Sequence, residues 1–421
     1  MNEIRNRRIE LTAEEQGMLR GELGEPVRRA LELQLEVGKF YGARRFVPVT
    51  NVHMMGDIEV MGDSGLDHLC KLVRAGARCE VAITTNARCF DFAYVDKLGQ
   101  DPGEAAKERQ LIGYLRQMNV MTTDTCINYQ TLYQPHFGEH LAWGDTGTVI
   151  WANSVCGARS NFESGPAAMA AAMTRRVPEY GYHLDEHRRG TFVVEVKAEL
   201  EDFAEWGAMA KLVGESHQSY FAVPVFTGIR RAPTADELKH LGASLASYGS
   251  MAMFHMVGVT PEAPTLKAAL GGNKPTDRMK ITRADIERVF ASYMNPDHSC
   301  NFVVFSGPQL SLFEMKLLAE LFDGRRVHAG TTVFVTTSNG VLSAARALGY
   351  AQKLEAAGVT ILEGVCVYIL QNLTRMRAAN GWTNMISNSA KIVNTITAHK
   401  FNTILRRTRD CVEIACTGVF R

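Results

Sequence analysis

The chain has histidines and carboxylates at points where predicted strands end. One apolar run ends near His53 and another near His255, and an acidic residue follows each within about ten positions. Ligands of open α/β sheets bind at the carboxyl ends of the strands, so these loops are expected to converge on one site. His and carboxylate side chains at such ends suit general acid–base catalysis. The predicted proton-transfer residues are His53, Asp63, His255 and Glu262.

Two cations in comparable loops could bind a carboxylic acid. Arg159 lies in a small, polar, glycine-punctuated run, and Lys391 lies near the C-terminus. Either could bind a substrate carboxylate through charge-assisted hydrogen bonds. The predicted hydrogen-bond partners of the substrate are Asn153, Ser154, Asn161 and Ser389. Each of these residues taken singly also fits ordinary turn chemistry, and it is their number that favours a site.

One short motif matches a known metal site. His183-Leu-Asp-Glu-His187 has the H-x-x-E-H spacing of inverted zinc peptidases, in which two histidines one helical turn apart bind zinc. Gly181 and Gly190 leave barely two helical turns around it, and a strand is expected from Thr191 onward. We therefore interpret the motif as a polar loop that leads into a strand.

Strands and helices alternate along the chain. Helices are expected at residues 14–41, 65–75 and 104–118, with strands at 46–52 and 79–84. Further strands, with helices between them, are expected at 192–200, 222–229, 251–259, 301–305, 332–336 and 359–362. Such alternation is typical of parallel sheets covered by helices. The prediction is an α/β protein of several parallel-sheet domains, with boundaries at 1–190, 191–327 and 328–421.

Composition restricts the class of protein further. The 421 residues are 46% hydrophobic and 22% charged, and 46 Lys and Arg against 45 Asp and Glu leave a net charge of +1. Nucleic-acid binding through bulk charge is therefore not expected. No run of about 18 apolar residues predicts a membrane span, and the charged segment 1–8 lacks the apolar core of a secretory signal. Nine cysteines at irregular spacing then indicate reduced thiols and a cytoplasmic protein.

Taken together, several of these segments resemble the large, catalytic part of aconitase X. The resemblance extends from about residue 46 to residue 391 and covers most of the chain. The matching segments are Gly62-Asp-Ser-Gly-Leu66, Thr122-Thr-Asp-Thr-Cys126, Gly138-Glu-His-Leu-Ala-Trp143, Ala152-Asn-Ser-Val-Cys-Gly-Ala-Arg159, Pro178-Glu-Tyr-Gly-Tyr-His183, Asp185-Glu-His-Arg188, Phe254-His-Met-Val-Gly-Val-Thr-Pro-Glu-Ala263 and Asn388-Ser-Ala-Lys391. Within this resemblance the H-x-x-E-H motif is simply part of a family loop.

The resemblance implies an aconitase-like fold that lacks the swivelling fourth domain, which in the family is either fused or a separate small subunit. A chain of 421 residues has no room for that domain, so a small swivel subunit is the expected partner. The resemblance also implies a hydro-lyase (dehydratase) acting on a small hydroxy acid, such as cis-3-hydroxy-L-proline or mevalonate 5-phosphate. In the family an iron–sulfur cluster leaves one iron open as a Lewis acid, while a base removes the proton next to the carboxylate. Lys391 and Arg159 would stabilise the developing charge.

The sequence departs from the family at the cluster. Cys126 and Cys366 match two of the three family cysteines and are the predicted metal ligands. In the segment that matches the family's Gly-Cys-Pro-His, Gly307 stands where the third cysteine should be and Gln309 where the histidine should be. Glycine has no side chain to bind iron, and Cys300 lies seven residues upstream across a predicted strand.

Further replacements lie in nearby loops: Thr146-Gly147 for a Ser-Ser pair, Asn128 for a proline and Phe162 for an arginine. Three states of the site therefore remain open. They are a smaller cluster or one with a non-cysteine ligand, a single metal ion on Cys126 and Cys366, and no metal. The alternatives for function are another lyase or isomerase reaction on a related acid, and a non-catalytic scaffold that binds the small subunit.

Overall fold

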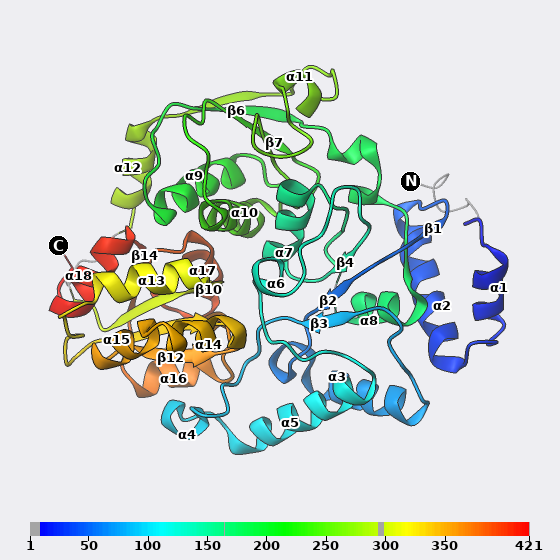
Figure 1. Ribbon diagram of the computed structural model, residues 1–421, viewed down its shortest axis with the longest axis horizontal. Coiled ribbons are helices and arrows are strands. Elements are labelled where there is room, and N and C mark those ends of the chain that lie inside the picture. Colours follow the sequence, from blue (N-terminus) through cyan, green and yellow to red (C-terminus); the bar gives the residue numbers. More distant parts are fainter. Residues whose placement is uncertain (1–8, 164, 294–298, 421) are drawn as a thin grey trace.

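The computed structural model describes residues 9–163, 165–293 and 299–420, which form three α/β units in chain order (Figure 1). In Figure 1 the first unit runs from blue through cyan and teal to the green helix α8 (Gly165–Thr174) and lies on the right, along the bottom and into the centre. The green middle unit lies at the top, and the yellow-to-red third unit lies on the left. Each unit contains one parallel sheet. The several parallel-sheet domains expected from the sequence are therefore confirmed.

The first unit is built on the parallel sheet β3-β2-β4 and adds an antiparallel pair, β1 and β5. Its strands are β1 (Phe46–Pro48), β2 (Val52–Met54), β3 (Ile83–Thr85), β4 (Ala142–Trp143) and β5 (Arg176–Pro178). Its helices are α1 (Ala13–Leu19), α2 (Glu25–Tyr41), α3 (Ile58–Arg74), α4 (Val95–Leu98), α5 (Pro102–Gln117), α6 (Asn128–Thr131), α7 (Thr146–Trp151) and α8 (Gly165–Thr174). Shorter turns are the π-helical η1 (Ala152–Cys156) and the 3-10 turns η2 (Gly181–His183) and η3 (Asp185–Arg188).

Two predicted elements of the first unit are divided in the structure. The helix expected over 14–41 is two helices, because Gly21 and Gly24 adopt positive φ angles of 83° and 93° between them. The strand expected over 46–52 is also two, since β1 pairs with β5 whereas β2 pairs with β3 and β4.

The middle unit is built on the parallel sheet β8-β7-β6-β9. Its strands are β6 (Phe192–Val196), β7 (Pro224–Thr227), β8 (His255–Met256) and β9 (Arg278–Ile281). Its helices are α9 (Phe203–Ser216), α10 (Ala235–Gly249), α11 (Leu266–Ala269) and α12 (Arg283–Ala291). Helix α10 packs against α9, α7 of the first unit and α17 of the third (Ala390–Thr395), so the middle unit meets its neighbours through helices.

The third unit is built on the parallel sheet β12-β11-β10-β13-β14. Its strands are β10 (Phe302–Leu310), β11 (Thr332–Thr337), β12 (Thr360–Glu363), β13 (Asn384–Ser387) and β14 (Asn402–Leu405). Besides α17, its helices are α13 (Leu312–Leu321), α14 (Asn339–Ala347), α15 (Tyr350–Ala356), α16 (Leu373–Ala379) and α18 (Thr408–Thr417), with the 3-10 turns η4 (Val367–Ile369) and η5 (Ile396–His399). Strand β10 is central in this sheet and buried along its whole length, so the change of sheet falls between β9 and β10, ahead of the boundary expected at residue 327.

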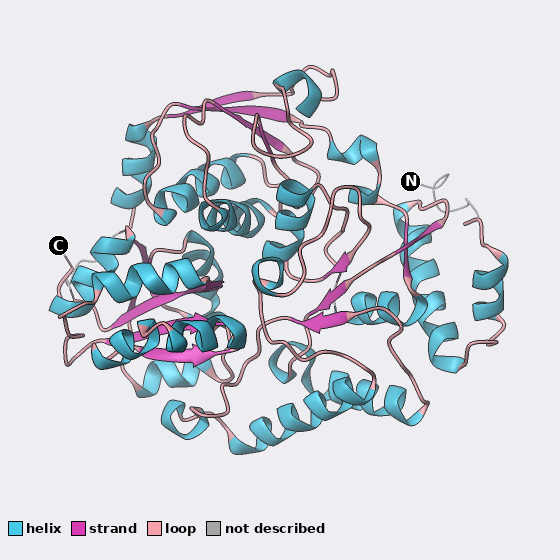
Figure 2. Cartoon of the chain, viewed as in Figure 1, coloured by secondary structure: helices cyan, strands magenta, loops and turns pink. Residues whose placement is uncertain are grey.

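The carboxyl ends of the first and third sheets face the interior between the two units. In Figure 2 the arrowheads of β3 and of the five-stranded sheet point toward the middle of the molecule. The largest buried apolar cluster joins Trp143 of the first unit, Trp206 of the middle unit and Phe305 of the third. Side chains that follow the strands of these two sheets therefore meet in a buried region. None of the helices in the described parts of the chain is long and apolar enough to cross a membrane.

Candidate active site

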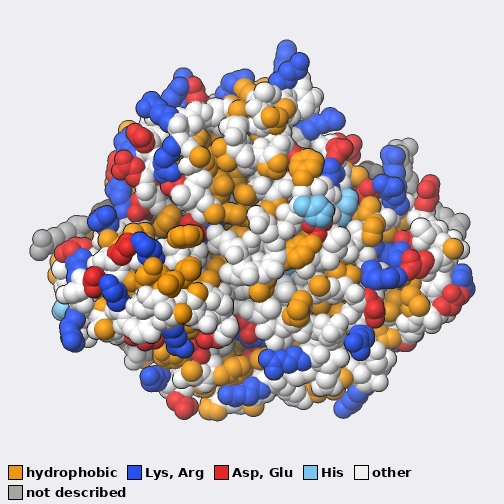
Figure 3. Space-filling view, viewed as in Figure 1, with side chains coloured by type: hydrophobic (Ala, Val, Ile, Leu, Met, Phe, Trp, Pro, Cys, Tyr) orange, Lys and Arg blue, Asp and Glu red, His pale blue; other side chains and the backbone are white. Residues whose placement is uncertain are grey.

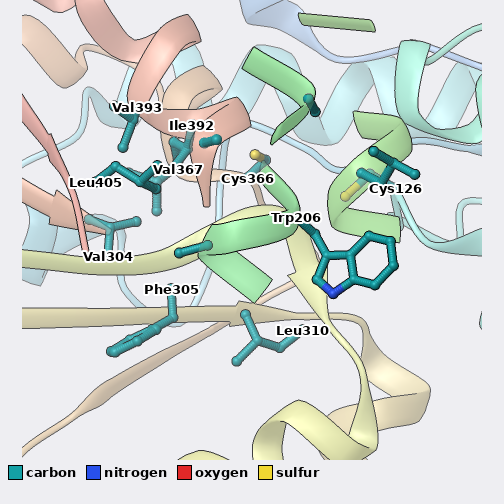
Figure 4. Close-up of a cluster of buried hydrophobic side chains, with 14 of the residues drawn as sticks. Cys126, Trp206, Val304, Phe305, Leu310, Cys366, Val367, Ile392, Val393 and Leu405 are labelled. Carbon is teal, nitrogen blue, oxygen red and sulfur yellow. The ribbon is translucent and has the colours of Figure 1, made fainter. Parts of the chain in front are cut away.

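Two buried thiols from different units meet in this region. Cys126 lies in the loop before α6, two residues ahead of the first residue of that helix, and Cys366 lies in the loop after β12. Figure 4 shows both side chains in one buried cluster. Burial, and the nearby Cys366, raise the pKa of Cys126 to about 12. Burial also raises the pKa of Cys366, although Lys391 and a hydrogen bond with Ser306 oppose this effect. Both side chains are therefore protonated thiols at neutral pH.

Gln309, at the position of the family's histidine, joins the two segments that carry the thiols. Its side-chain amide donates to the carbonyls of Asp124 and Val365, each at 3.2 Å, and its Oε1 accepts from the N–H of Cys126 at 3.2 Å. Its own backbone N–H donates to the Cys126 sulfur at 3.2 Å. Gln309 therefore fixes the Cys126 loop against the Cys366 segment through hydrogen bonds that are all buried or nearly so.

Gly307, at the position of the third family cysteine, has a backbone that disfavours any side chain. Its φ of +59° lies in the left-handed region, and a Cβ atom there would lie 3.1 Å from Cβ of Ile392 on α17. Ser389 donates its hydroxyl hydrogen bond to the Gly307 carbonyl and caps α17, so this predicted substrate partner connects β10 to the helix that carries Lys391. Cys300 precedes the amino end of β10, roughly 20 Å along the strand from position 307.

The iron–sulfur cluster that the resemblance implies is held by three cysteines. Cys126 and Cys366 are brought together, but position 307 supplies no donor atom and Cys300 lies at the opposite end of β10. Among the described residues, no group of three or more His, Cys, Asp or Glu side chains is arranged to bind a metal ion. The donor set therefore does not fit a cluster held by three cysteines.

Lys391 and Asp145 supply opposite charges beside the thiols. Lys391 is 4% exposed, and its Nζ lies 3.6 Å from Oδ1 of Asp145, which follows β4 and is 6% exposed. Burial by itself would lower the pKa of Lys391, but the Asp145 carboxylate raises it, and the pKa lies above its ordinary value, so the side chain is an ammonium. Asp145 was not among the predicted residues, although its position directly after a strand and before a helix was a usable signal.

His53 lies beneath this pair on β2. Its Nδ1 lies 2.8 Å from the Thr84 hydroxyl and its Nε2 lies 3.4 Å from Oδ1 of Asn86, so both ring nitrogens have partners. Burial lowers the pKa of His53 to about 4, although the Asp145 carboxylate opposes this effect. The side chain is therefore a neutral imidazole that binds β3 and the residue that follows it.

Four predicted substrate residues lie within η1 or shortly after it, away from Asp145 at the start of α7: Asn153, Ser154, Arg159 and Asn161. Asn153 is eight positions after Asp145, which is ~12 Å along a helix. Its amide bonds backbone groups of Ser160 and Ala252, and Ser154 accepts from the N–H of Phe254. Such contacts order the loop without leaving these polar groups free for a substrate.

Asn161 and Arg159 are likewise engaged with protein. Asn161 donates to the Tyr180 carbonyl and accepts from the N–H of Tyr182. Arg159 forms an ion pair with Asp185 and donates to the His183 carbonyl. Their assignment to substrate stays a prediction.

His255 and Glu262 belong to a separate cluster around Arg188. The Nε2 of His255 donates to the Arg188 carbonyl at 2.7 Å, and Glu262 forms an ion pair with the Arg188 guanidinium. Burial lowers the pKa of His255. Asp63 is exposed on α3 and forms an ion pair with Lys107 at 2.7 Å. Of the four predicted proton-transfer residues, His53 is the one whose pKa the Asp145 carboxylate is shown to raise.

Asn128 adds an unpartnered amide next to the thiols. It is fully buried two residues after Cys126, and neither polar atom of its side chain has a hydrogen-bond partner in the described structure. The Tyr129 hydroxyl, beside it on α6, also has none there. Buried polar groups are almost always satisfied by protein, water or ligand, so α6 marks a polar wall of the site. The signal for this wall in the sequence was Asn128, which stands where the family has a proline.

A cleft of about 620 Å³ runs along the segments that carry the thiols. One wall is formed by residues 122–125, which end one position before Cys126. The other wall includes residues 338–340, after β11, and Gly364, two positions before Cys366. The cleft therefore separates the first unit from the third beside the buried pair.

Comparisons with known proteins show the family of the chain. Models of the aconitase X first, second and third domains match residues 8–186, 190–291 and 300–417. The phosphomevalonate dehydratase large subunit of Methanothermobacter thermautotrophicus is 34% identical over 363 residues, which are 86% of this chain and 88% of that protein. A cis-3-hydroxy-L-proline dehydratase of Pseudomonas aeruginosa is 30% identical over 390 residues, 90% of this chain and 65% of that protein.

A solved structure supports the same conclusion. The crystal structure of Thermococcus kodakaraensis aconitase X in its holo-form matches with a TM-score of 0.86 and 30% identity, covering 97% of this chain and all of that one. The match extends over all three units, and the aconitase-like fold expected from the sequence is confirmed. The chain belongs to the aconitase X family.

Proposed function

We propose that this chain is the large, catalytic subunit of a hydro-lyase that removes water from a small hydroxy carboxylic acid. The observation that carries the proposal is the buried Lys391–Asp145 pair, located where the carboxyl ends of two parallel sheets meet in an aconitase X chain. Relatives in this family are named dehydratases, for phosphomevalonate and for cis-3-hydroxy-L-proline. Both substrates are hydroxy acids with a removable proton next to a carboxylate.

The site supplies the charges that such an elimination needs. A cation beside the leaving hydroxyl and a carboxylate beside the carbon-bound proton would each act more strongly in a buried site than in water. Lys391 and Asp145 are such a pair, whereas the thiols of Cys126 and Cys366 are protonated and uncharged. The described residues do not fit a three-cysteine cluster, so the proposed elimination does not use one.

A small swivel-type subunit is the proposed partner. The similar protein from Methanothermobacter is named a large subunit. Here, the loop after α6 presents Leu132 and Phe137, which are 49% and 62% exposed, and Leu132 also lines the cleft beside the thiols. Figure 3 shows charged side chains of both signs around one face of the molecule, with many apolar side chains toward its middle. A subunit that covers this loop would close the cleft over substrate.

The test is a search for the dehydrated product. The full chain, purified with a co-expressed small subunit, is incubated with cis-3-hydroxy-L-proline, mevalonate 5-phosphate and related hydroxy acids. Mass spectrometry is expected to show a product lighter by one water for at least one of them. If none of the acids loses water, with or without the small subunit, the hydro-lyase proposal is wrong.

A second candidate is a lyase or isomerase reaction of another kind at the same site. Gly307 in place of the family's cysteine is the observation that favours it, because the chain has lost a ligand of the usual dehydration chemistry. Proton transfer without loss of water would leave the product mass unchanged in light water. In heavy water it would add deuterium next to the carboxylate, and the absence of any product lighter by one water would separate it from dehydration in the same assay.

A further inference from the structure

We propose that Lys391 and Asp145 are the acid and the base of a dehydration that does not use a three-cysteine cluster. This inference rests on the proposed function and assigns the reacting atoms within it. Asp145 Oδ1 would contact the proton next to the substrate carboxylate, and Lys391 Nζ would contact the departing hydroxyl.

The first observation is that the carboxylate is already oriented. Asp145 caps α7, and its Oδ2 accepts from the backbone N–H groups of Gly147 at 2.9 Å and Thr148 at 3.3 Å. These bonds fix the side chain and leave Oδ1 directed toward Lys391. A base that is fixed before substrate binds has little reorganisation to complete during the reaction.

The second observation is the spacing of the pair. Lys391 Nζ and Asp145 Oδ1 are 3.6 Å apart, beyond an ordinary N–H···O hydrogen bond of 2.7–3.2 Å. The two groups are therefore close enough to exchange a proton through a small movement. A Cβ atom at Gly147 would lie 3.1 Å from Asp145 Oδ2 and 3.6 Å from Lys391 Nζ, so a larger residue there, such as the family's serine, would crowd the pair.

The third observation is the chemistry of the residues that remain around the pair. Gln309 uses its amide to bind the Cys126 loop, and the backbone at position 307 is left-handed and packed against Ile392. Position 307 offers no donor atom beside Cys126 and Cys366, so the described residues supply two of the three sulfur ligands that the family uses. Lys391 and Asp145 are the charged pair beside these thiols.

The proposed step is balanced in atoms and electrons. Asp145 Oδ1 first takes the proton from the carbon next to the carboxylate, and the electron pair of that C–H bond is held as the enolate of the carboxylate. That pair then becomes the new carbon–carbon double bond. The C–O bond to the hydroxyl breaks, and the oxygen leaves with its bonding pair and takes a proton from Lys391 Nζ as water. The Asp145 carboxyl then returns its proton to the Lys391 amine across the 3.6 Å gap, which restores both groups.

Two variants distinguish the base from the acid. Each is made in the full chain and assayed with its small subunit. Asp145→Asn can still cap α7, because asparagine is as good a cap as aspartate. It should lower dehydration at least about 100-fold, the usual contribution of general acid–base catalysis, and should also abolish deuterium exchange next to the carboxylate in heavy water. Lys391→Met should lower dehydration similarly but retain that exchange. The matched control is Lys316→Met, on the exposed side of α13, which should leave both rates unchanged.

Iron and acid-labile sulfide per chain give a test that does not depend on the variants folding. Protein purified without oxygen should contain neither in stoichiometric amount, and Cys126→Ser should not change the visible spectrum. Stoichiometric iron and sulfide in the wild-type protein would overturn this inference and leave the hydro-lyase intact. Dehydration by Lys391→Met at the wild-type rate would overturn it as well. If the wild-type complex dehydrates no hydroxy acid, the proposed function itself fails.

Discussion

At the scale of single residues, hydrogen bonds decide which polar side chains remain free to react. Asn153, Ser154 and Asn161 have side chains that bind backbone groups, whereas Lys391 and Asp145 oppose each other at 3.6 Å. A buried polar group that binds the backbone stabilises a loop, and its removal leaves that backbone group unsatisfied. Residue type alone does not distinguish these two cases.

Gln309→Ala should destabilise the protein by about 2–4 kcal/mol. The variant leaves the buried N–H of Cys126 and the carbonyls of Asp124 and Val365 without their partner, and each such loss costs ~1 kcal/mol or more. Urea unfolding followed by circular dichroism measures the change. Gln117→Ala is the control, since that exposed side chain bonds only one carbonyl of its own helix, and it should change stability by less than about 0.5 kcal/mol. Equal effects of the two substitutions would contradict this role of Gln309.

Glu163 should make stability depend on pH. Burial raises the pKa of Glu163 to about 7, and its Oε1 has no hydrogen-bond partner among the described residues. The folded protein therefore binds this proton more tightly than the unfolded chain, so stability falls as pH rises from about 5 to about 7 and levels off above that. The whole effect is at most about 3 kcal/mol.

Glu163→Gln should flatten this dependence. The free energy of unfolding of the wild type and the variant should be similar near pH 5, and the variant should be the more stable protein at pH 8. Unfolding by urea at several pH values gives both curves. Parallel curves for the two proteins would show that Glu163 does not titrate in the folded state.

At the scale of elements, the packing of β10 against α17 explains why the position of the third family cysteine disfavours a side chain. The strand changes register between Phe305 and Leu310, and Gly307 within this irregularity packs on Ile392 of α17. Ser389 caps the same helix and binds the Gly307 carbonyl, so the geometry at position 307 depends on both elements.

Gly307→Cys should fail to rebuild a cluster. A side chain at φ +59° and 3.1 Å from Ile392 strains the backbone, and we expect a loss of about 1–3 kcal/mol and no gain of iron. Thermal melting and iron analysis after anaerobic reconstitution measure both. Gly340→Ala on α14 is the control, because nothing lies within 4 Å of a Cβ there and alanine favours the helix. Stoichiometric iron bound by Gly307→Cys would show that this backbone adapts.

At the scale of the whole molecule, buried charges join the middle unit to the third. Lys239 and His240 of α10 both bind Glu314 of α13, and Lys239 is fully buried. Lys239 also donates to the Gln309 carbonyl at 3.2 Å, which connects this network to the thiol site. Burial by itself would raise the pKa of Glu314, but Lys239 and His240 lower it to about 2.

Glu314→Gln should destabilise the protein by about 2–3 kcal/mol, because the buried Lys239 ammonium loses one of its two carboxylates and keeps only Asp236 at 3.3 Å. Differential scanning calorimetry near neutral pH measures the loss. The lowered pKa predicts that this contribution is present above about pH 4.5 and is lost as the pH falls toward 2. Glu320→Gln, in an exposed pair on the same helix, should have little effect. A melting temperature of Glu314→Gln equal to that of the wild type would contradict the role of the network.

The sequence by itself determined the alternation of strands and helices, the family and the loss of the third cysteine, because periodicity and residue identity are local properties. It also indicated His53, Cys126, Cys366 and Lys391, which follow strands or lie in matching motifs. Only the tertiary structure showed that the middle sheet meets its neighbours through helices, so that His255 and Glu262 lie around Arg188 instead of at the thiol site. It also placed Asp145 opposite Lys391, since the contact depends on how two units pack and no spacing within one chain segment encodes it.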